Sequence, residues 1–207
     1  SCTILRADVC EVHDGTAPTP RHMLEGAKIV AINRRGKQLA LLAHDGRTLC
    51  IHLGMTGSLE LVADASAPHT HITWRVGPRT LAFRDPRRFG GLWPFESEHA
   101  LLAARWSKLG PDALIATAEH LHESSRASTR AVKALLLDQS IIAGVGNIYA
   151  DEALFASKLS PHTRAGRVKI PTWGQLVDNL RVILTGAIDA GGSTIRDYRG
   201  PTGEAGR

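Results

Sequence analysis

The sequence predicts an α+β protein in which an antiparallel β-sandwich or barrel precedes a helical domain. Two observations lead to this prediction. Short apolar or alternating segments separated by Gly- and Pro-containing turns fill the first half of the chain, whereas apolar residues at helical spacing fill the second half. Strands and helices are therefore segregated along the chain, which favours this class over alternating β and α units.

Five strands are expected in the first half. They are separated by dipeptides that are typical of turns, namely Arg35-Gly36, Asp45-Gly46 and Gly77-Pro78. The expected strands are Lys28–Ile32, Gln38–Ala43, Thr48–Leu53, His71–Val76 and Thr80–Phe83. Near residues 97–108 the pattern changes, and the rest of the chain is expected to be helical.

Two helices are expected between residues 129 and 159. The first covers about Thr129–Asp138, where apolar residues recur on one face. The second begins near Asn147. Its apolar face is expected to consist of Ile148, Phe155 and Leu159.

A third helix shows the clearest pattern. A continuous apolar stripe runs from Trp173 to Ile188. Thr172 followed three residues later by Gln175 predicts a capping box at its start. The helix is expected to stop at Gly191-Gly192, because glycine commonly follows a helix C-terminus.

A domain boundary is expected between Gly110 and Arg126. The segment Glu119–Thr129 is polar, contains two histidines and four hydroxyl residues, and suits a linker. We therefore expect a β domain at 1–112 and a helical domain at 113–207.

Composition and charge restrict the class of protein. The 207 residues are 43% hydrophobic, and their formal net charge of +5 favours a polyanionic partner such as nucleic acid. No apolar run approaches the roughly 20 residues of a membrane helix. The three cysteines, Cys2, Cys10 and Cys50, show no Cys-x-x-Cys spacing. They favour a reducing compartment, and they argue against a disulfide framework or a zinc finger within these residues.

The segment Gly144–Glu152 is the most informative one. Two glycines between two expected helices permit a tight hairpin, and Asn147 lies where the amides of the next helix could bind a DNA phosphate. An isolated pair of glycines is more often a plain helix–helix turn. Glu152 falls on the expected apolar face, so we expect it to accept hydrogen bonds from the hairpin amides.

Two further segments combine cations or apolar side chains with tight turns. Asp85–Gly91 places an Arg pair beside Phe89, and His52–Leu59 places Met55 on a Gly-rich turn after a strand-end histidine. Enzymes that extrude a base from the stack often insert such side chains into the gap. Taken alone, the first segment is more often a β-turn with a solvated Arg pair, and a lone His or Met as in the second is more often a core residue.

Two weaker segments lie at either end of the chain. Lys37 enters an expected strand from a basic loop, where it could contact phosphate or act as an acid or base if its pKa were lowered. Gly191–Tyr198 combines glycines, donors and an aromatic ring, which suits a mobile lid. The plain alternatives are a solvated basic loop and a frayed terminus.

The joint order of these segments is more specific than any one of them. HLGMTGSL, DPRRFGG, LGPDAL, KALLLDQSIIAGVGNIYADEALF and GGSTIRDY follow one another along the chain. Together they resemble the formamidopyrimidine-DNA glycosylase family over nearly the whole chain, and HLGM and DPRRFG resemble its oxidised-purine branch more than its endonuclease VIII branch. GVGNIYADE resembles the family's helix–two-turn–helix element. The resemblance implies a β-sandwich followed by a helical domain that contains this element.

The resemblance also implies roles for individual residues. The residues that would grip phosphates around a flipped nucleotide are Lys37, His52 and Asn147, and Lys37 is the catalytic residue expected within this chain. The residues that would fill the emptied duplex position are Met55, Arg87 and Phe89, with Arg87 addressing the orphaned cytosine.

Two further sets follow from the same resemblance. The residues that lie where the family contacts the DNA backbone are His69, Arg126 and Arg130. The residues that match the loop closing over the damaged base are Thr194, Arg196 and Tyr198.

The implied activity is that of a DNA glycosylase and AP lyase. Such an enzyme flips oxidised purines, 8-oxoguanine and formamidopyrimidines, out of duplex DNA, excises them and nicks the abasic strand by elimination. The implied partner is duplex DNA containing oxidised purines or abasic sites, bound by a monomer in a bacterial cytoplasm.

The sequence departs from the family at both ends. The family begins with a Pro-Glu pair whose proline amine is the nucleophile, and it ends in a four-cysteine zinc finger. Neither is found between Ser1 and Arg207, so no metal ligand is expected within this chain and zinc is expected only in a full-length C-terminal finger. We interpret both departures as truncation of a genuine enzyme, in which case these 207 residues alone are expected to be inactive.

Two other hypotheses remain at this point. The first is a catalytically silent protein that binds damaged DNA or abasic sites on the same scaffold. The second is a general RNA-binding helix-hairpin protein, which is disfavoured because aromatic residues make up only 5% of the chain and single-strand binding usually requires a stacking surface.

Overall fold

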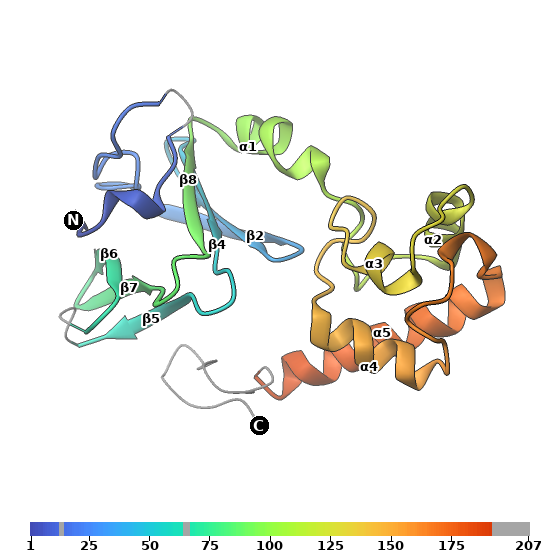
Figure 1. Ribbon diagram of the computed structural model, residues 1–207. Coiled ribbons are helices and arrows are strands. Elements are labelled where there is room, and N and C mark those ends of the chain that lie inside the picture. The colour runs from blue at the N-terminus through green and yellow to red at the C-terminus, as the bar shows by residue number, and fades with distance from the viewer. Residues whose placement is uncertain (13–14, 64–66, 192–207) are drawn as a thin grey trace. The chain divides into compact units, whose positions relative to one another are not determined.

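The computed structural model describes residues 1–12, 15–63 and 67–191, and the chain forms two compact units, Ser1–Ala104 and Arg105–Ala190. We call them the β unit and the helical unit, and their elements are labelled in Figure 1. Within the described ranges, no helix combines the length and the apolar content that crossing a membrane requires.

The β unit is a sandwich of two four-stranded antiparallel sheets, which confirms the predicted fold class. Their strand orders are β1-β6-β7-β5 and β2-β3-β4-β8. The strands are β1 (Cys2–Ile4), β2 (Ile29–Arg35), β3 (Gln38–Ala43), β4 (Thr48–His52), β5 (Ser58–Val62), β6 (Thr70–Val76), β7 (Arg79–Arg84) and β8 (Gly91–Phe95). A 3-10 turn, η1 (Ala7–Val9), follows β1, and the helix α1 (Glu98–Ala104) follows β8.

Side chains from both sheets share one core. The members with no exposed surface include Leu49, Ile51, Ile72, Phe83 and Leu92. Burial of each such side chain stabilises the folded state by about 1.5–3 kcal/mol before conformational entropy is counted. The sandwich is therefore held mainly by contacts between the sheets, and its ends are left to carry loops.

Three strands were missed by the sequence analysis, and all three lie at sheet edges. β1 has only three residues, and β8 contains Pro94, which lacks the amide that a central strand needs. β1, β5 and β8 each pair with a single neighbouring strand. Edge strands need a less complete apolar pattern than central ones, because fewer of their side chains are enclosed.

The helical unit packs short elements around one long helix. Its elements are η2 (Trp106–Lys108), α2 (Ala118–Ser125), α3 (Val132–Leu136), α4 (Asn147–Ala156), η3 (Ala165–Arg167) and α5 (Ile170–Asp189). Their shared core includes the fully buried residues Leu121, Leu135, Leu136, Trp173, Leu176 and Leu180. The predicted helical character of this half is confirmed, and so is the start of a helix at Asn147.

The predicted linker Glu119–Thr129 is wrong, because its first part is the helix α2. The Thr117 side chain accepts a hydrogen bond from the His120 amide and caps this helix. Leu121 is its buried anchor, with no exposed surface. The polar composition that suggested a linker is that of a short helix which buries few side chains.

Two other helix predictions require correction. α3 covers only Val132–Leu136, because the chain before it is held extended against the segment 161–165 rather than wound into a helix. The capping box at Thr172 is also wrong, since α5 already begins at Ile170 with Pro171 in its first turn. The predicted end is confirmed: α5 stops at Asp189, and Gly191 has a φ of +76°.

Gly110 of the LGPDAL segment lies against the turn that follows α3. Its amide donates to the Gln139 carbonyl at 2.9 Å. A Cβ atom at this position would overlap the backbone carbonyl of Ile141, whereas a Cβ at Gly186 in α5 would meet no atom within 4 Å. The two glycines therefore differ in whether a side chain can be added.

We predict that Gly110→Ala destabilises the helical unit by about 1–3 kcal/mol, because the backbone it approaches must move. Gly186→Ala, the matched control, should stabilise the protein by up to about 1 kcal/mol through helix propensity alone. Urea unfolding followed by circular dichroism measures both changes. Equal stability of the two variants would contradict the close approach.

Candidate nucleic-acid interface

One end of the β2-β3-β4-β8 sheet gathers several of the predicted site residues. Gln38 of β3 pairs with His52 of β4, and His52 in turn pairs with Gly91 of β8. The β2–β3 turn that carries Lys37, the end of β4 and the start of β8 therefore lie side by side. Strand register alone brings together segments that are about fifty residues apart in the sequence.

Lys37 occupies the two-residue turn between β2 and β3, after Gly36, which has a φ of +56°. Its side chain is exposed, yet partial withdrawal from water by the surrounding protein lowers the pKa of its amine. A lowered pKa makes the ammonium group a better proton donor near neutral pH. Both predicted roles, phosphate contact and acid–base work, are compatible with this placement.

His52 ends β4, as predicted. Its Nδ1 accepts a hydrogen bond from the Gly54 amide at 3.2 Å. An acceptor at Nδ1 places the proton of the neutral ring on Nε2. The hydrogen bond thus fixes the tautomer that can donate from the outer ring nitrogen.

The loops that carry Met55 and Phe89 touch each other through their backbones. A Cβ at Gly54 would lie 2.6 Å from the Gly90 amide nitrogen, and one at Gly90 would lie 2.7 Å from the His52 carbonyl oxygen. Met55 is nevertheless 73% exposed and Phe89 60% exposed. Two apolar side chains therefore project into solvent from one tightly packed support.

The two arginines of DPRRFGG have different environments. Arg88 has a φ of +55°, and its guanidinium forms an ion pair with Asp8 at 2.9 Å. Arg87 is exposed, and within the described part of the chain its side chain has no carboxylate partner. Arg87 is therefore the more available cation of the two, in agreement with its predicted role.

His69 lies near the same loop but is held differently. It is exposed and has a φ of +65°, a conformation that non-glycine residues rarely adopt. Its carbonyl accepts the Asp85 amide at 3.1 Å, which joins the start of β6 to the end of β7. The predicted DNA contact of His69 remains a prediction.

In the helical unit, Gln139 holds the glycine hairpin together. Its Oε1 accepts the Gly144 amide at 3.0 Å, and its Nε2 donates to the carbonyls of Leu137 and Val145, each at 3.0 Å. The sequence analysis did not single out Gln139. A signal was present, because an amide side chain before a GxG turn offers both a donor and an acceptor to unpaired backbone groups.

The predicted role of Glu152 is wrong. Its side chain is exposed, and Gln139 takes the hairpin amide instead. The predicted apolar face of α4 is also wrong, since Phe155 is 87% exposed and Ile148 39% exposed. The face that packs consists of Ala150, Ala153 and Leu154. Small alanines allow close helix packing, and they were overlooked in favour of larger apolar residues.

Asn147 is the first residue of α4 and is exposed, and Gly146 is the N-cap. Gly146 supplies no side-chain cap at the start of this helix. This geometry is compatible with the predicted phosphate contact at Asn147.

The two predicted arginines of the helical unit are both paired. Arg126 is on the surface and bonds Glu123 at 3.1 Å, while Arg130 bonds Asp138 at 2.7 Å and the Ala134 carbonyl at 2.8 Å. The Ser140 hydroxyl and Arg130 lower the pKa of Asp138 to about 2. Because exposed ion pairs contribute little stability, little free energy is lost when Arg126 exchanges Glu123 for a DNA phosphate.

Several features lie apart from these residues. Thr194, Arg196 and Tyr198 fall outside the described residues. In the described ranges, no three His, Cys, Asp or Glu side chains are grouped so as to hold a metal ion, and the expected zinc finger remains a prediction.

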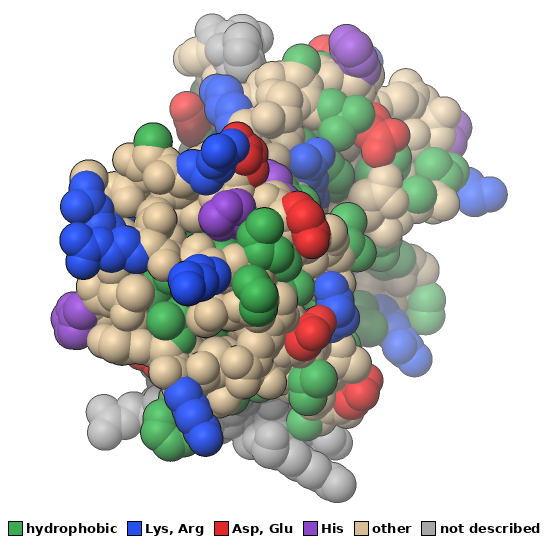
Figure 2. Space-filling view, turned by 90° about the vertical axis from the view of Figure 1, so that its right-hand side faces the viewer, with side chains coloured by type: hydrophobic (Ala, Val, Ile, Leu, Met, Phe, Trp, Pro, Cys, Tyr) green, Lys and Arg blue, Asp and Glu red, His purple; other side chains and the backbone are tan. Residues whose placement is uncertain are grey.

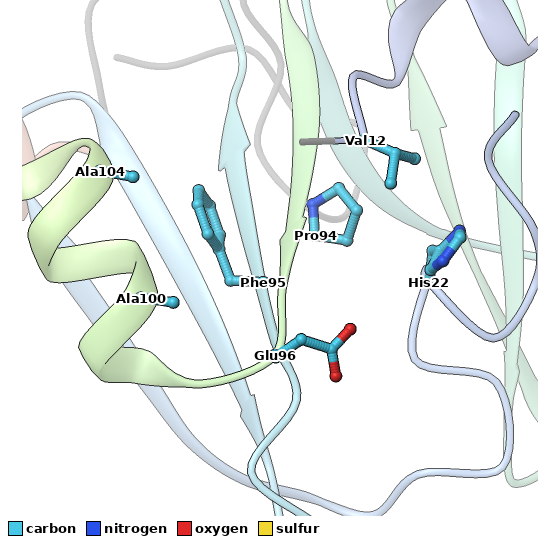
Figure 3. A pocket seen from close by; sticks show the side chains of 7 residues that line it. All are labelled: Val12, His22, Pro94, Phe95, Glu96, Ala100 and Ala104. Atoms are coloured by element: carbon cyan, nitrogen blue, oxygen red, sulfur yellow. The ribbon is translucent and has the colours of Figure 1, made fainter. Parts of the chain in front are cut away.

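A mainly apolar pocket between β8 and α1 is lined by Phe95, Ala100 and His22 among others, and by none of the predicted DNA contacts (Figure 3).

The charged side chains on the face drawn in Figure 2 do not form one patch. Figure 2 shows Lys and Arg side chains at separate places on the visible face, with Asp and Glu side chains among them. Net charge alone therefore does not mark an interface in this view, and the loops described above are better guides.

Comparison with known families matches both halves of the chain. Residues 1–92 match the family described as formamidopyrimidine-DNA glycosylase N-terminal domain, and residues 109–199 match the formamidopyrimidine-DNA glycosylase H2TH domain. The chain is 41% identical over 191 residues to a formamidopyrimidine-DNA glycosylase of Teredinibacter turnerae, covering 88% of this chain and 69% of the relative. It is 42% identical over 193 residues to one of Burkholderia cenocepacia, with the same coverage.

Solved structures give the same result. The MutM (Fpg) protein of Thermus thermophilus superposes with a TM-score of 0.84 at 37% identity, covering 98% of this chain and 74% of that one. Lactococcus lactis Fpg in complex with DNA containing an abasic site superposes with a TM-score of 0.86 at 30% identity, covering 100% and 76%.

The hairpin hydrogen bonds lead to a second prediction. Gln139→Leu should destabilise the helical unit by about 1–3 kcal/mol, because it leaves the partly buried Gly144 amide and Val145 carbonyl without this partner. Gln175→Leu on the exposed face of α5 is the matched control, and we expect little change there. Thermal unfolding compares them, and a Gln139→Leu variant as stable as the control would contradict the role of Gln139.

Proposed function

The chain belongs to the formamidopyrimidine-DNA glycosylase family, and from this premise we propose that it acts as a DNA repair glycosylase and AP lyase. It flips oxidised purines out of duplex DNA, excises them and nicks the abasic strand by elimination. One observation carries the proposal: two apolar side chains and one available cation, Met55, Phe89 and Arg87, project from loops in backbone contact at one end of the sandwich.

The chemistry of base extrusion explains this set of side chains. Extruding a base costs a few kcal/mol of stacking, and apolar groups inserted into the gap offset part of that cost. Met55 and Phe89 are exposed without DNA and would be covered by it. An orphaned cytosine presents two neighbouring acceptors on its pairing edge, and the planar guanidinium of Arg87 can donate to both.

Phosphate contacts position the duplex but do not identify the lesion. Lys37 and His52 supply donors at the end of the same sheet, and the hydrogen bond from Gly54 to Nδ1 keeps the His52 proton on Nε2. The lowered pKa of Lys37 additionally suits proton transfer during excision. In the helical unit, Asn147 is the proposed phosphate contact.

We also propose a cellular setting. The relatives are proteins of bacteria, which supports a bacterial cytoplasm, and we propose that the protein binds DNA as a monomer. The expected loop residues Thr194, Arg196 and Tyr198 would contribute to lesion recognition, and zinc would belong to a C-terminal finger.

Binding and excision assays test the proposed function separately. Fluorescence anisotropy with the 207-residue chain should show at least tenfold tighter binding to a duplex with a tetrahydrofuran abasic analogue opposite cytosine than to undamaged duplex. Because phosphate contacts release counterions, log K should fall linearly with log salt. Release of 8-oxoguanine and borohydride trapping of the intermediate, measured on the full-length native protein, test the chemistry.

The outcomes separate the hypotheses. Lesion preference with excision and a trapped adduct supports the glycosylase. If the 207-residue chain and the full-length protein both prefer the lesion, but the full-length protein does not excise it, the protein is instead a silent damaged-DNA binder. Binding that is independent of salt and of the lesion would overturn both.

Arg87→Ala should reduce the preference for cytosine opposite the lesion about tenfold or more, because a bidentate contact contributes about 1–3 kcal/mol of discrimination. General affinity for duplex DNA should fall much less. Arg79→Ala removes the same charge from another exposed position of the β unit and should leave discrimination unchanged. Equal losses on all opposing bases would show that Arg87 acts only as a positive charge.

A further inference from the structure

Asp85 is a buried carboxylate at the end of β7, and it joins the two loops that carry Met55, Arg87 and Phe89. It has no exposed surface. Its Oδ1 accepts the Thr56 hydroxyl at 2.6 Å and the Arg87 amide at 3.2 Å, and its Oδ2 accepts the Gly90 amide at 2.8 Å. One side chain therefore bonds the residue after Met55, the Arg87 backbone and the residue after Phe89.

Hydrogen bonding keeps this carboxylate ionised. Burial by itself would raise the pKa of Asp85, but hydrogen bonds from Thr56, Gly90 and the Arg87 and Arg88 amides outweigh it, and the pKa is lowered. A hydroxyl bonded to an ionised carboxylate at 2.6 Å is a short, charge-assisted interaction, roughly twice as strong as a neutral hydrogen bond. Near neutral pH the bridge between the loops is thus fully formed.

The backbone of Asp85 is fixed to the sandwich as well. Its carbonyl accepts from Nε2 of the buried His71 at 2.8 Å, and its amide donates to the His69 carbonyl at 3.1 Å. The carboxylate therefore starts from a strand end whose backbone is hydrogen-bonded on both sides of the residue.

The loops have little room to rearrange around this bridge. The Gly57 amide donates to the Leu53 carbonyl at 2.8 Å, which closes the Met55 turn on itself. Gly54 and Gly90 meet with no space for a side chain. Met55, Arg87 and Phe89 extend outward from this packed backbone, and the neighbouring Arg88 is turned to Asp8.

We propose that Asp85 and Thr56 are positioning residues, which lock the two loops together so that Met55, Arg87 and Phe89 enter the duplex as one preorganised unit. The inference rests on the proposed function. A site held in its bound geometry loses less entropy on binding and keeps its discrimination. Recognition of the base opposite the lesion therefore depends on a hydroxyl that does not itself need to touch DNA.

Thr56→Val tests the bridge, because valine keeps the shape of threonine and removes the hydroxyl. We expect a several-fold loss of preference for cytosine opposite an abasic analogue, with an unchanged far-ultraviolet circular dichroism spectrum. Thr56→Ser retains the hydroxyl and should restore most of that preference. Thr73→Val, a control within β6, should have no effect. Asp85→Asn is less suitable, since its amide would place N–H groups against backbone donors.

A double-mutant cycle separates positioning from a merely structural role. If the loops act as a unit, the combined loss of abasic-site affinity in Met55→Ala/Phe89→Ala should differ several-fold from the product of the two single losses. In the Thr56→Val background the two losses should become multiplicative. The cycle is measured by anisotropy on the same duplexes.

The outcomes distinguish this inference from the proposed function. Unaltered discrimination and unaltered coupling in Thr56→Val, in a protein that prefers abasic over undamaged DNA, would overturn the inference and leave the proposed function intact. Absence of lesion preference in the unmodified protein would overturn the proposed function, and the inference with it.

Discussion

Backbone groups withdrawn from water need hydrogen-bond partners, and in the loops that carry the candidate site single side chains supply them for partly buried groups. In the β unit, Asp85 accepts the amides of Arg87 and Gly90, which no strand can pair. In the helical unit, Gln139 accepts the Gly144 amide and donates to two carbonyls. Each polar side chain supplies the hydrogen bonds that a strand or helix would otherwise supply, at a place where the chain turns too sharply to form either.

Glycine is the counterpart of these side chains. Gly54, Gly90 and Gly110 lie where another backbone passes too close for a Cβ, so the loops can be packed as tightly as a core while they remain at the surface. A side chain that inserts between bases needs both features: a tightly packed backbone that supports it and an exposed end that can enter the duplex. Exposed Met55 and Phe89 would be a liability on a plain surface, but here their backbone is held in place before any ligand arrives.

Local sequence patterns predicted the elements that depend only on residues close in sequence. The central strands, the helix start at Asn147 and the stop before Gly191 all follow from alternation or from glycine chemistry. What failed depends on partners distant in sequence: the edge strands β1, β5 and β8, the helix α2 behind its linker-like composition, and the packed face of α4. The candidate site was found by resemblance and motif, but strand register, which brings Lys37 beside His52, could be seen only in the fold.

Pairing decides which of the arginines can serve a ligand, and for the pairs of Arg88 and Arg130, which are distant in sequence, the sequence carries no sign of it. Arg88, Arg126 and Arg130 each face a carboxylate, whereas Arg87 has none among the described residues. DNA must displace or share those partners before the paired arginines contribute, and for Arg130 the competitor is a carboxylate whose pKa is lowered to about 2. The formal net charge of +5 already subtracts these carboxylates and does not say which arginines can reach a phosphate, so specificity falls on the groups that the fold leaves without a carboxylate partner.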